Sequence, residues 1–261
     1  MKYIRKKYPD GGIYASVQDF SPPHVITERI NNYEDLFFIK SLKEVLDYNG
    51  VKDVEIVIPC LFQQQADRRF ETNQSFELKL ICEFIDSCNF KKVSVFHPHS
   101  DVSSIAIKNF FSIDNSEFIK KVLADIPGHP IMLSTDGGSY KWINKLANTI
   151  AFDEEVYGAS KARKYDTEKN EHSMVQVIDR KDFLGADILV VDDLCVYGGT
   201  FLGLSKMLKE RNAGKVYLAV SHITVPNPNP ELDSAFERIY CTDSKYDSYN
   251  LNNLKIFPWR S

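Results

Sequence analysis

The stretch Ile188–Thr200 decides the fold and reads ILVVDDLCVYGGT. Its first four residues are continuously apolar, which predicts a buried strand over Ile188–Val191. Asp192 and Asp193 follow this predicted strand directly. Because ligands of open α/β sheets bind at the carboxyl ends of the strands, we expect a ligand to lie against these two carboxylates.

A glycine-bearing loop then opens a helix, which we expect over Phe201–Arg211 with Gly214 as its stop. Gly198 and Gly199 let backbone N–H groups approach a ligand closely. The Thr200 hydroxyl and the helix N-terminus add donors for an anion. Since paired aspartates suit the two hydroxyls of a sugar diol, the whole stretch predicts a cradle for a phosphorylated sugar.

Short β-rich runs alternate with amphipathic stretches along the rest of the chain. This alternation predicts an α/β fold of two related lobes, each with a mainly parallel sheet flanked by helices. We place the boundary between the lobes within residues 112–128 and divide the chain into 1–118 and 119–261. As an alternative, the last strand could cross back and pair in the sheet of the first lobe. The other predicted strands and helices are Val54–Ile58, Phe76–Ile85, Val93–Phe96, Ile131–Leu133, Tyr140–Thr149 and Val216–Val220.

Residues Gly158–Ser173 are polar and weakly patterned. We expect them to form a surface loop, and the bases among them suit a loop that closes over an anionic ligand.

Composition excludes several classes of protein. The 261 residues carry a net charge of −4, so there is no basic excess to neutralise a nucleic-acid backbone, and we expect no nucleic-acid partner. No window approaches the roughly 20 apolar residues of a membrane span, and the basic start lacks the apolar centre of a signal peptide. We therefore expect no membrane partner. Five scattered cysteines without metal-ligand spacing predict reduced thiols in the core, and hence a cytoplasmic protein; they are Cys60, Cys82, Cys88, Cys195 and Cys241.

The stretch Ile188–Thr200 resembles the phosphoribosyl-pyrophosphate (PRPP) loop of type I phosphoribosyltransferases and, more closely, that of the ribose-phosphate pyrophosphokinases. Five other segments resemble motifs of the pyrophosphokinases in the same order along the chain. They are Tyr8–Gly12 (adenine loop), Val57–Arg69 (ATP-binding segment), Val95–Ser100 (metal and ATP site), Ser134–Lys141 (Ser-Pro-Asp-x-Gly-Gly segment) and Ser160–Arg163 (catalytic flexible loop).

The resemblance implies a phosphoribosyltransferase-type fold and a Mg²⁺-dependent enzyme. Such an enzyme transfers the pyrophosphoryl group of ATP to the anomeric hydroxyl of ribose 5-phosphate and releases AMP. It also implies a homo-oligomer, with ATP bound by lobe 1–118 and the ribose-phosphate loop carried by lobe 119–261.

The resemblance assigns roles to individual residues. Lys161 and Arg163 are the implied catalytic cations, and His99 and Asp136 the implied metal ligands. The ribose and its 5′-phosphate are expected at Asp192, Asp193, Tyr197, Gly198, Gly199 and Thr200. ATP is expected at Tyr8, Asp10, Gln65, Asp67, Arg68 and His99.

The chain also departs from the family pattern. Gln65-Ala66 stands where the family has Arg-Gln, and Val196-Tyr197 replaces an aspartate and a threonine of the PRPP loop. By the same comparison, we expect the chain to lack roughly the first strand and helix of a full-length member. Tyr197 offers a ring that could stack on a nucleobase, so ADP-ribose is an alternative acceptor. A phosphoribosyltransferase that consumes PRPP and a non-catalytic regulatory protein also remain open.

Overall fold

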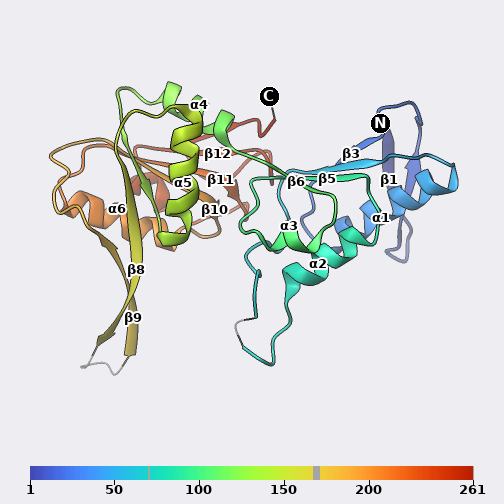
Figure 1. The fold of residues 1–261 in the computed structure, drawn as a ribbon, viewed down its shortest axis with the longest axis horizontal. Helices are drawn as coiled ribbons and strands as arrows, with labels where there is room; N and C mark the ends of the chain where they lie inside the picture. The colour runs from blue at the N-terminus through green and yellow to red at the C-terminus, as the bar shows by residue number, and fades with distance from the viewer. Residues whose placement is uncertain (70, 167–170, 261) are drawn as a thin grey trace. The chain divides into compact units, whose positions relative to one another are not determined.

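The computed structural model describes residues 1–69, 71–166 and 171–260; for residues 161–166 and 171–176 it describes the backbone alone. The chain divides into two compact units, Met1–Asp114 and Asn115–Ser261. The division falls four residues before the lobe boundary that we placed at residue 118. Each unit has a mainly parallel sheet with helices against it (Figure 1). The predicted α/β class is thus confirmed.

In the first unit, a parallel sheet has the strand order β3-β4-β5-β6, and an antiparallel hairpin pairs β1 with β2. The predictions at Val54–Ile58, Phe76–Ile85 and Val93–Phe96 correspond to β4, α2 and β5. The elements are β1 (Tyr3–Lys7), β2 (Ile13–Val17), β3 (Val25–Thr27), α1 (Tyr33–Tyr48), β4 (Glu55–Ile58), α2 (Glu77–Asp86), β5 (Lys92–Phe96), α3 (Val102–Ala106) and β6 (Phe110–Ile113).

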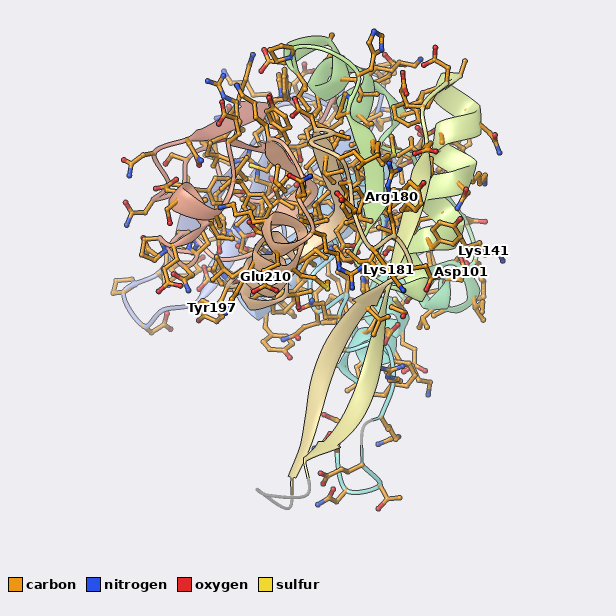
Figure 2. All side chains as sticks on the ribbon, turned by 90° about the vertical axis from the view of Figure 1, so that its left-hand side faces the viewer. Asp101, Lys141, Arg180, Lys181, Tyr197 and Glu210 are labelled. Atoms are coloured by element: carbon orange, nitrogen blue, oxygen red, sulfur yellow. The ribbon has the colours of Figure 1, made fainter. Side chains whose placement is uncertain are left out.

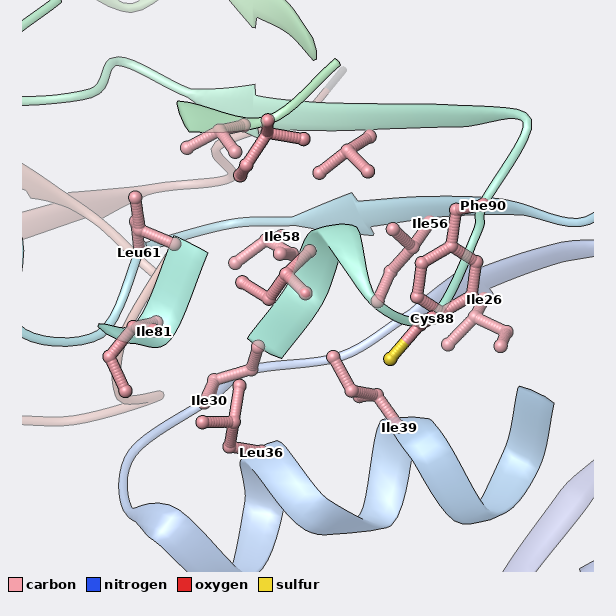
Figure 3. Packing of buried hydrophobic residues seen from close by; sticks show 14 of the residues in the cluster. Ile26, Ile30, Leu36, Ile39, Ile56, Ile58, Leu61, Ile81, Cys88 and Phe90 are labelled. Atoms are coloured by element: carbon pink, nitrogen blue, oxygen red, sulfur yellow. The ribbon is translucent and has the colours of Figure 1, made fainter. Parts of the chain in front are cut away.

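The core of this unit lies between the sheet and its helices. Leu36 and Ile39 of α1 point toward Ile56 and Ile58 of β4 in Figure 3, and all four side chains are buried. The amphipathic face of α2 joins the same core through Ile81. Apolar burial on this scale stabilises a unit by roughly 1.5–3 kcal/mol per large side chain.

In the second unit, the strand order is β13-β12-β11-β10-β7-β8-β9. Pairing is parallel from β13 to β8, and among the described strands of this unit only β9 runs antiparallel, against β8. The last strand therefore pairs within this unit. The elements are α4 (Ser116–Asp125), β7 (Ile131–Ser134), α5 (Gly137–Ile150), β8 (Val156–Asp166), β9 (Glu171–Ile178), β10 (Ile188–Cys195), α6 (Gly199–Glu210), β11 (Val216–Ile223), α7 (Leu232–Ala235), β12 (Arg238–Thr242) and β13 (Leu254–Phe257).

Strand β10 is buried on both faces, as its continuous apolar sequence predicts. Ile188 and Val190 pack with residues of α6, whereas Leu189 and Val191 pack with residues of α4 and α5. Helices thus cover both faces of the sheet at its centre, which is the arrangement expected for parallel strands. No helix among the described residues combines the length and the apolar character needed to cross a membrane.

Strand β10 is longer than predicted. It continues through Asp192 and Asp193 to Cys195, because its ladder with β11 continues past the apolar run. Pairing supplies hydrogen bonds to the backbone whatever the side chains are, so apolar periodicity marks only the buried part of a strand.

The predicted stop of the following helix was also wrong. Helix α6 ends at Glu210, and Asn212 (φ = 56°) rather than Gly214 takes the left-handed position after it. Gly214 is instead required by close approach, because a Cβ there would lie 2.4 Å from the carbonyl oxygen of Gly185.

We predicted that the polar stretch Gly158–Ser173 forms a surface loop. This was wrong, because the stretch lies mostly in strands β8 and β9. Pairing of β8 with β7 ends at Gly158, and pairing with β9 then runs from Ala159 to Asp166. The paired strands project from the sheet as a two-stranded arm (Figure 1). A ribbon of this kind has backbone hydrogen bonds without needing a buried face, so the alternation that marks half-buried strands is missing from its sequence.

Candidate active site

The candidate site of the second unit lies where β7 and β10 end. These strands are parallel neighbours, and Ser134 of β7 stands opposite Val191 of β10. Their carboxyl ends therefore bring Thr135 and Asp136 beside Asp192 and Asp193. The Thr135 hydroxyl donates to Asp192 Oδ2, and the backbone N–H of Asp193 donates to Asp192 Oδ1 at 2.9 Å.

The carboxyl of Asp192 is held in an environment that opposes its charge. Burial of the group and, next, the neighbouring carboxyl of Asp193 raise its pKa well above the ordinary aspartate value. The hydrogen bond from Thr135 acts in the opposite direction but does not outweigh these two effects. Carboxyl groups with a strongly shifted pKa at the end of a strand are typical of functional sites, because a bound ligand can offset the unfavourable environment of the charge.

Replacing Asp192 with asparagine should stabilise the ligand-free protein, and more so at higher pH. A raised carboxyl pKa means that the folded state binds more protons than the unfolded chain, so wild-type stability falls as pH rises above about 3.9. Asparagine does not titrate, so its advantage should be greatest at alkaline pH and vanish in acid. Urea unfolding across the pH range measures this difference. The exposed Asp153→Asn variant is the control, and an Asp192→Asn advantage that does not depend on pH would contradict the assignment.

The glycine-bearing loop forms the start of α6, as predicted. Gly198 is the N-cap residue, with φ = 91° in the left-handed region. A Cβ at this position would lie 2.7 Å from Cδ1 of the buried Leu232. Conformation and space therefore both require glycine at 198. At Gly199, an added Cβ would have nothing within 4 Å, so this position does not require glycine for steric reasons.

The first turn of α6 is accessible to a ligand. Gly199 and Thr200 are exposed, and helix N-termini present unpaired N–H groups that favour anions. Tyr197 precedes the turn with 65% of its surface exposed, and Figure 2 labels it at the molecular surface. Its carbonyl oxygen accepts a hydrogen bond from the Asn229 N–H at 3.1 Å, which anchors the loop while leaving the ring outside.

Asp136 is the N-cap of α5. Its Oδ1 accepts the Ser139 N–H at 2.9 Å, and the Ser139 hydroxyl accepts the Asp136 N–H at 3.1 Å. This capping box starts the helix at Gly137, three residues before the predicted Tyr140. The sequence held the signal, since a capping residue followed three positions later by a polar partner marks a helix start. The role of Asp136 as a metal ligand remains a prediction.

The implied catalytic residues Lys161 and Arg163 both lie on β8, opposite Gln176 and Met174 of β9. Their side chains are outside the described part of the structure. Their catalytic role therefore remains a prediction.

In the first unit, the loops that follow β4 and β5 lie together, because these strands are parallel neighbours with Ile58 opposite Val95. Gln64, 3% exposed, joins the two loops: its Oε1 accepts the His99 N–H at 3.2 Å, and its Nε2 contacts Cys60 Sγ at 3.6 Å. Gln64 is not among the site residues predicted from the sequence. Three consecutive glutamines look alike in sequence, whereas in the structure Gln63 has φ = 59° and only Gln64 of the three is buried.

Four of the predicted ATP-binding residues lie on these loops. Gln65, Arg68 and His99 are exposed, and Asp67 is half-buried. His97, by contrast, is buried and has φ = 40°. The structure thus brings the 64–68 segment and His99 to one edge of the first sheet, whereas the second predicted metal ligand, Asp136, belongs to the other unit.

Tyr8 and Asp10 lie at the tip of the β1–β2 hairpin. The Tyr8 N–H donates to the Gly12 carbonyl at 2.7 Å, and Asp10 Oδ1 accepts the Gly12 N–H at 3.0 Å. Tyr8 is 54% exposed and packs on Tyr14 with ring centroids 4.8 Å apart. The tip is therefore a well-defined turn with an accessible aromatic ring, but its role toward adenine remains a prediction.

Two other groups of residues have side chains of the metal-binding type, but neither forms part of this site. The five cysteines are buried free thiols, as predicted, and burial raises the pKa of the Cys195 thiol to about 12. His129, Asp153 and Glu154 form an exposed cluster, but they precede β7 and β8 and so lie at the opposite edge of the sheet from Asp192.

The Phosphoribosyl transferase domain family matches residues 101–245, which include β7, β10 and the start of α6. The chain belongs to this family. Curated relatives include the ribose-phosphate pyrophosphokinase of Methanobrevibacter smithii, 25% identical over 85% of this chain and 78% of its own length. That of Pyrococcus furiosus is 22% identical over 83% of this chain and 76% of its own length.

The fold of this phosphoribosyl transferase family member also matches a solved structure. The crystal structure of phosphoribosylpyrophosphate synthetase from Mycobacterium smegmatis has a TM-score of 0.80 and 15% identity, and covers 98% of this chain and 86% of its own. The predicted resemblance to ribose-phosphate pyrophosphokinases and the phosphoribosyltransferase-type fold are confirmed. The prediction of a diphosphokinase-type transferase is confirmed at the level of its class.

Proposed function

We propose that this protein transfers the pyrophosphoryl group of ATP to the anomeric hydroxyl of a ribose 5-phosphate, forming PRPP and releasing AMP. The observation that carries the proposal is the edge where Asp192 and Asp193 stand beside the glycine-capped start of α6. Carboxylates accept hydrogen bonds from ribose hydroxyls, and the helix start binds the 5′-phosphate. The relatives named ribose-phosphate pyrophosphokinase support the same reaction.

In the proposed reaction, the anomeric hydroxyl oxygen attacks the β-phosphorus of ATP and gives up its proton to solvent. The bond from that phosphorus to the α–β bridging oxygen breaks, and AMP leaves with the electron pair. The task of the protein is to hold the two substrates in line and to offset charge on the phosphates. Asp192 and Asp193 would orient the ribose, and Lys161 and Arg163 would neutralise the migrating group. Tyr8, Asp10, Gln65, Asp67, Arg68 and His99 are proposed to contact ATP.

We also propose Mg²⁺ as the metal that neutralises and orients the phosphates. The carboxylate of Asp136 suits this ion, because Mg²⁺ prefers oxygen ligands and keeps several waters. The imidazole of His99 is a poorer direct ligand, so contact through a water fits its chemistry better. The expectation of a homo-oligomer stays a proposal as well, based on the resemblance.

ADP-ribose is a second candidate acceptor, favoured by the exposed ring of Tyr197 beside the Gly198 turn. Val196 and Tyr197 remove a carboxylate and a hydroxyl that the family pattern places there. A hydrogen bond from a hydroxyl to a terminal phosphate dianion is worth about 1.5–3 kcal/mol. The nearer phosphate of a diphosphate carries less charge, so the loss of this hydrogen bond weakens its binding less. The ring of Tyr197 could then stack on the adenine.

A competition assay tests both acceptors. Equal ribose 5-phosphate and ADP-ribose are incubated with limiting ATP and Mg²⁺, and the products are separated by mass while AMP release is followed. We expect PRPP to be the main product. A product one pyrophosphate heavier than ADP-ribose would establish the second acceptor. No AMP release with either acceptor would overturn the proposed activity and favour a regulatory protein. The departures from the family pattern at Gln65-Ala66 and Val196-Tyr197 would then fit the loss of catalysis.

A further inference from the structure

Two arginines hold the base of the β8–β9 hairpin. Arg211 follows α6 directly, and its Nη1 donates to two carbonyl oxygens at the end of β9, those of Ile178 and, at 2.6 Å, Arg180. These carbonyls belong to the strand by which the chain leaves the hairpin. One guanidinium therefore fixes the exit strand against the end of a helix.

Arg180 holds the other strand of the hairpin. Its Nη1 donates to Glu155 Oε2 at 2.5 Å and to the Tyr157 hydroxyl at 2.8 Å, where the chain enters β8. Its guanidinium also lies over the rings of Tyr157 and Phe183, at 5.1 and 5.3 Å from their centroids. Figure 2 labels Arg180 near the point where the arm joins the sheet. Arg211 thus holds the backbone of Arg180, whose side chain in turn holds the entry strand.

The same helix connects this base to the ribose-phosphate cradle. Helix α6 has 12 residues, a length of about 18 Å, and begins at the turn capped by Gly198. At its other end, the Arg211 carbonyl accepts the Phe183 N–H at 2.8 Å and the Asn212 carbonyl accepts the Gly185 N–H at 2.7 Å. Helix α6 is therefore a rigid connection between the base of the hairpin and the cradle, which is the predicted ribose-phosphate site at Asp192, Asp193 and the Gly198 turn.

We propose that Arg180 and Arg211 form a brace that sets the direction of the β8–β9 hairpin relative to the cradle, and that both are positioning residues for the transfer step. The hairpin needs such a brace, because its pairing with β7 ends at Gly158 and an isolated two-stranded ribbon is only marginally stable. The part concerning catalysis rests on the proposed function, since β8 carries Lys161 and Arg163. A displacement of about 1 Å in a catalytic group costs roughly 100-fold in rate.

The test uses Arg211→Lys and Arg180→Lys, which keep the charge but replace a planar fork with a single ammonium. Amide hydrogen exchange of the full protein measures how firmly the base of the hairpin is held, and it does not depend on enzyme activity. We expect amides at 156–160 and 177–180 to exchange at least about threefold faster, while those of β10 and β11 are unchanged. We also expect kcat to fall about tenfold with KM for ribose 5-phosphate within about twofold of wild type. Arg238→Lys, on an exposed arginine of β12, is the matched control.

Unchanged exchange in the hairpin of both variants would overturn the brace. Faster exchange with wild-type kcat would overturn the positioning role. If the wild-type protein makes no product, the proposed function fails together with the positioning role, whereas faster exchange in the variants would still establish the brace itself. Arg180→Lys keeps the proposal testable if Arg211→Lys does not fold.

Discussion

Replacing Lys161 with alanine should lower kcat for pyrophosphoryl transfer at least about 100-fold, equivalent to about 2.7 kcal/mol or more of lost transition-state stabilisation. The reason is the loss of a cation where charge develops on the migrating phosphates. The fold should survive, because Lys161 pairs with Gln176 through backbone groups that alanine keeps. AMP release under saturating ATP and ribose 5-phosphate measures the effect, and the melting temperature checks the fold.

The exposed Lys206 of α6 provides the control, since Lys206→Ala removes the same charge from a position outside the hairpin and the cradle. We expect its kcat to match wild type. Turnover near the wild-type rate in folded Lys161→Ala would remove this lysine from the catalytic machinery.

Replacing Gly198 with alanine should destabilise the protein and weaken phosphate binding at the same time. A left-handed conformation costs an alanine about 1–2 kcal/mol, and overpacking a buried position costs about 1–3 kcal/mol. Both apply at Gly198, with φ = 91° and Leu232 at 2.7 Å from the added Cβ. We therefore expect a loss of about 2–5 kcal/mol in the free energy of unfolding. Urea unfolding measures the loss, and KM for ribose 5-phosphate should rise as the first turn of α6 shifts.

Gly199→Ala is the matched control, because its added Cβ meets nothing within 4 Å. Its stability should stay within about 1 kcal/mol of wild type. The double variant Gly198→Ala/Leu232→Ala removes the overlap but not the strained φ, so it should lose less than the sum of the two single variants. Additive losses would show that Leu232 does not restrict this position, and a Gly198→Ala protein as stable as wild type would contradict the whole assignment.

The two units differ in how much of their candidate sites could be read from sequence. In the second unit, strand, carboxylates, glycine turn and helix start follow one another in Ile188–Thr200, so one local pattern carried most of the prediction. In the first unit, the contact that joins the loops runs from Gln64 to His99, between segments that follow different strands. No local pattern distinguishes Gln64 from its neighbouring glutamines.

The hairpin at β8–β9 shows the limit of hydrophobic patterning most clearly. The sequence of Gly158–Ser173 has no buried face to mark it as a strand, although its polar character and its bases were visible. Its base is set by Arg180 and Arg211, whose partners Glu155, Tyr157 and Ile178 lie on other segments. Nothing in the residues next to either arginine predicts these contacts.

By itself, the sequence determined the α/β class, the buried β10, the carboxylates at its end and the glycine turn that opens α6. These features depend on burial and backbone conformation over a few consecutive residues, which composition and order express directly. Only the tertiary structure decided which strands are neighbours, and hence that Thr135 donates to Asp192 and that Arg211 holds the hairpin. Such contacts depend on strand order and register, because chain folding brings together residues that share no local pattern. The requirement for glycine at 198 belongs to both: its left-handed turn is local, whereas the space that Leu232 takes from a side chain is tertiary.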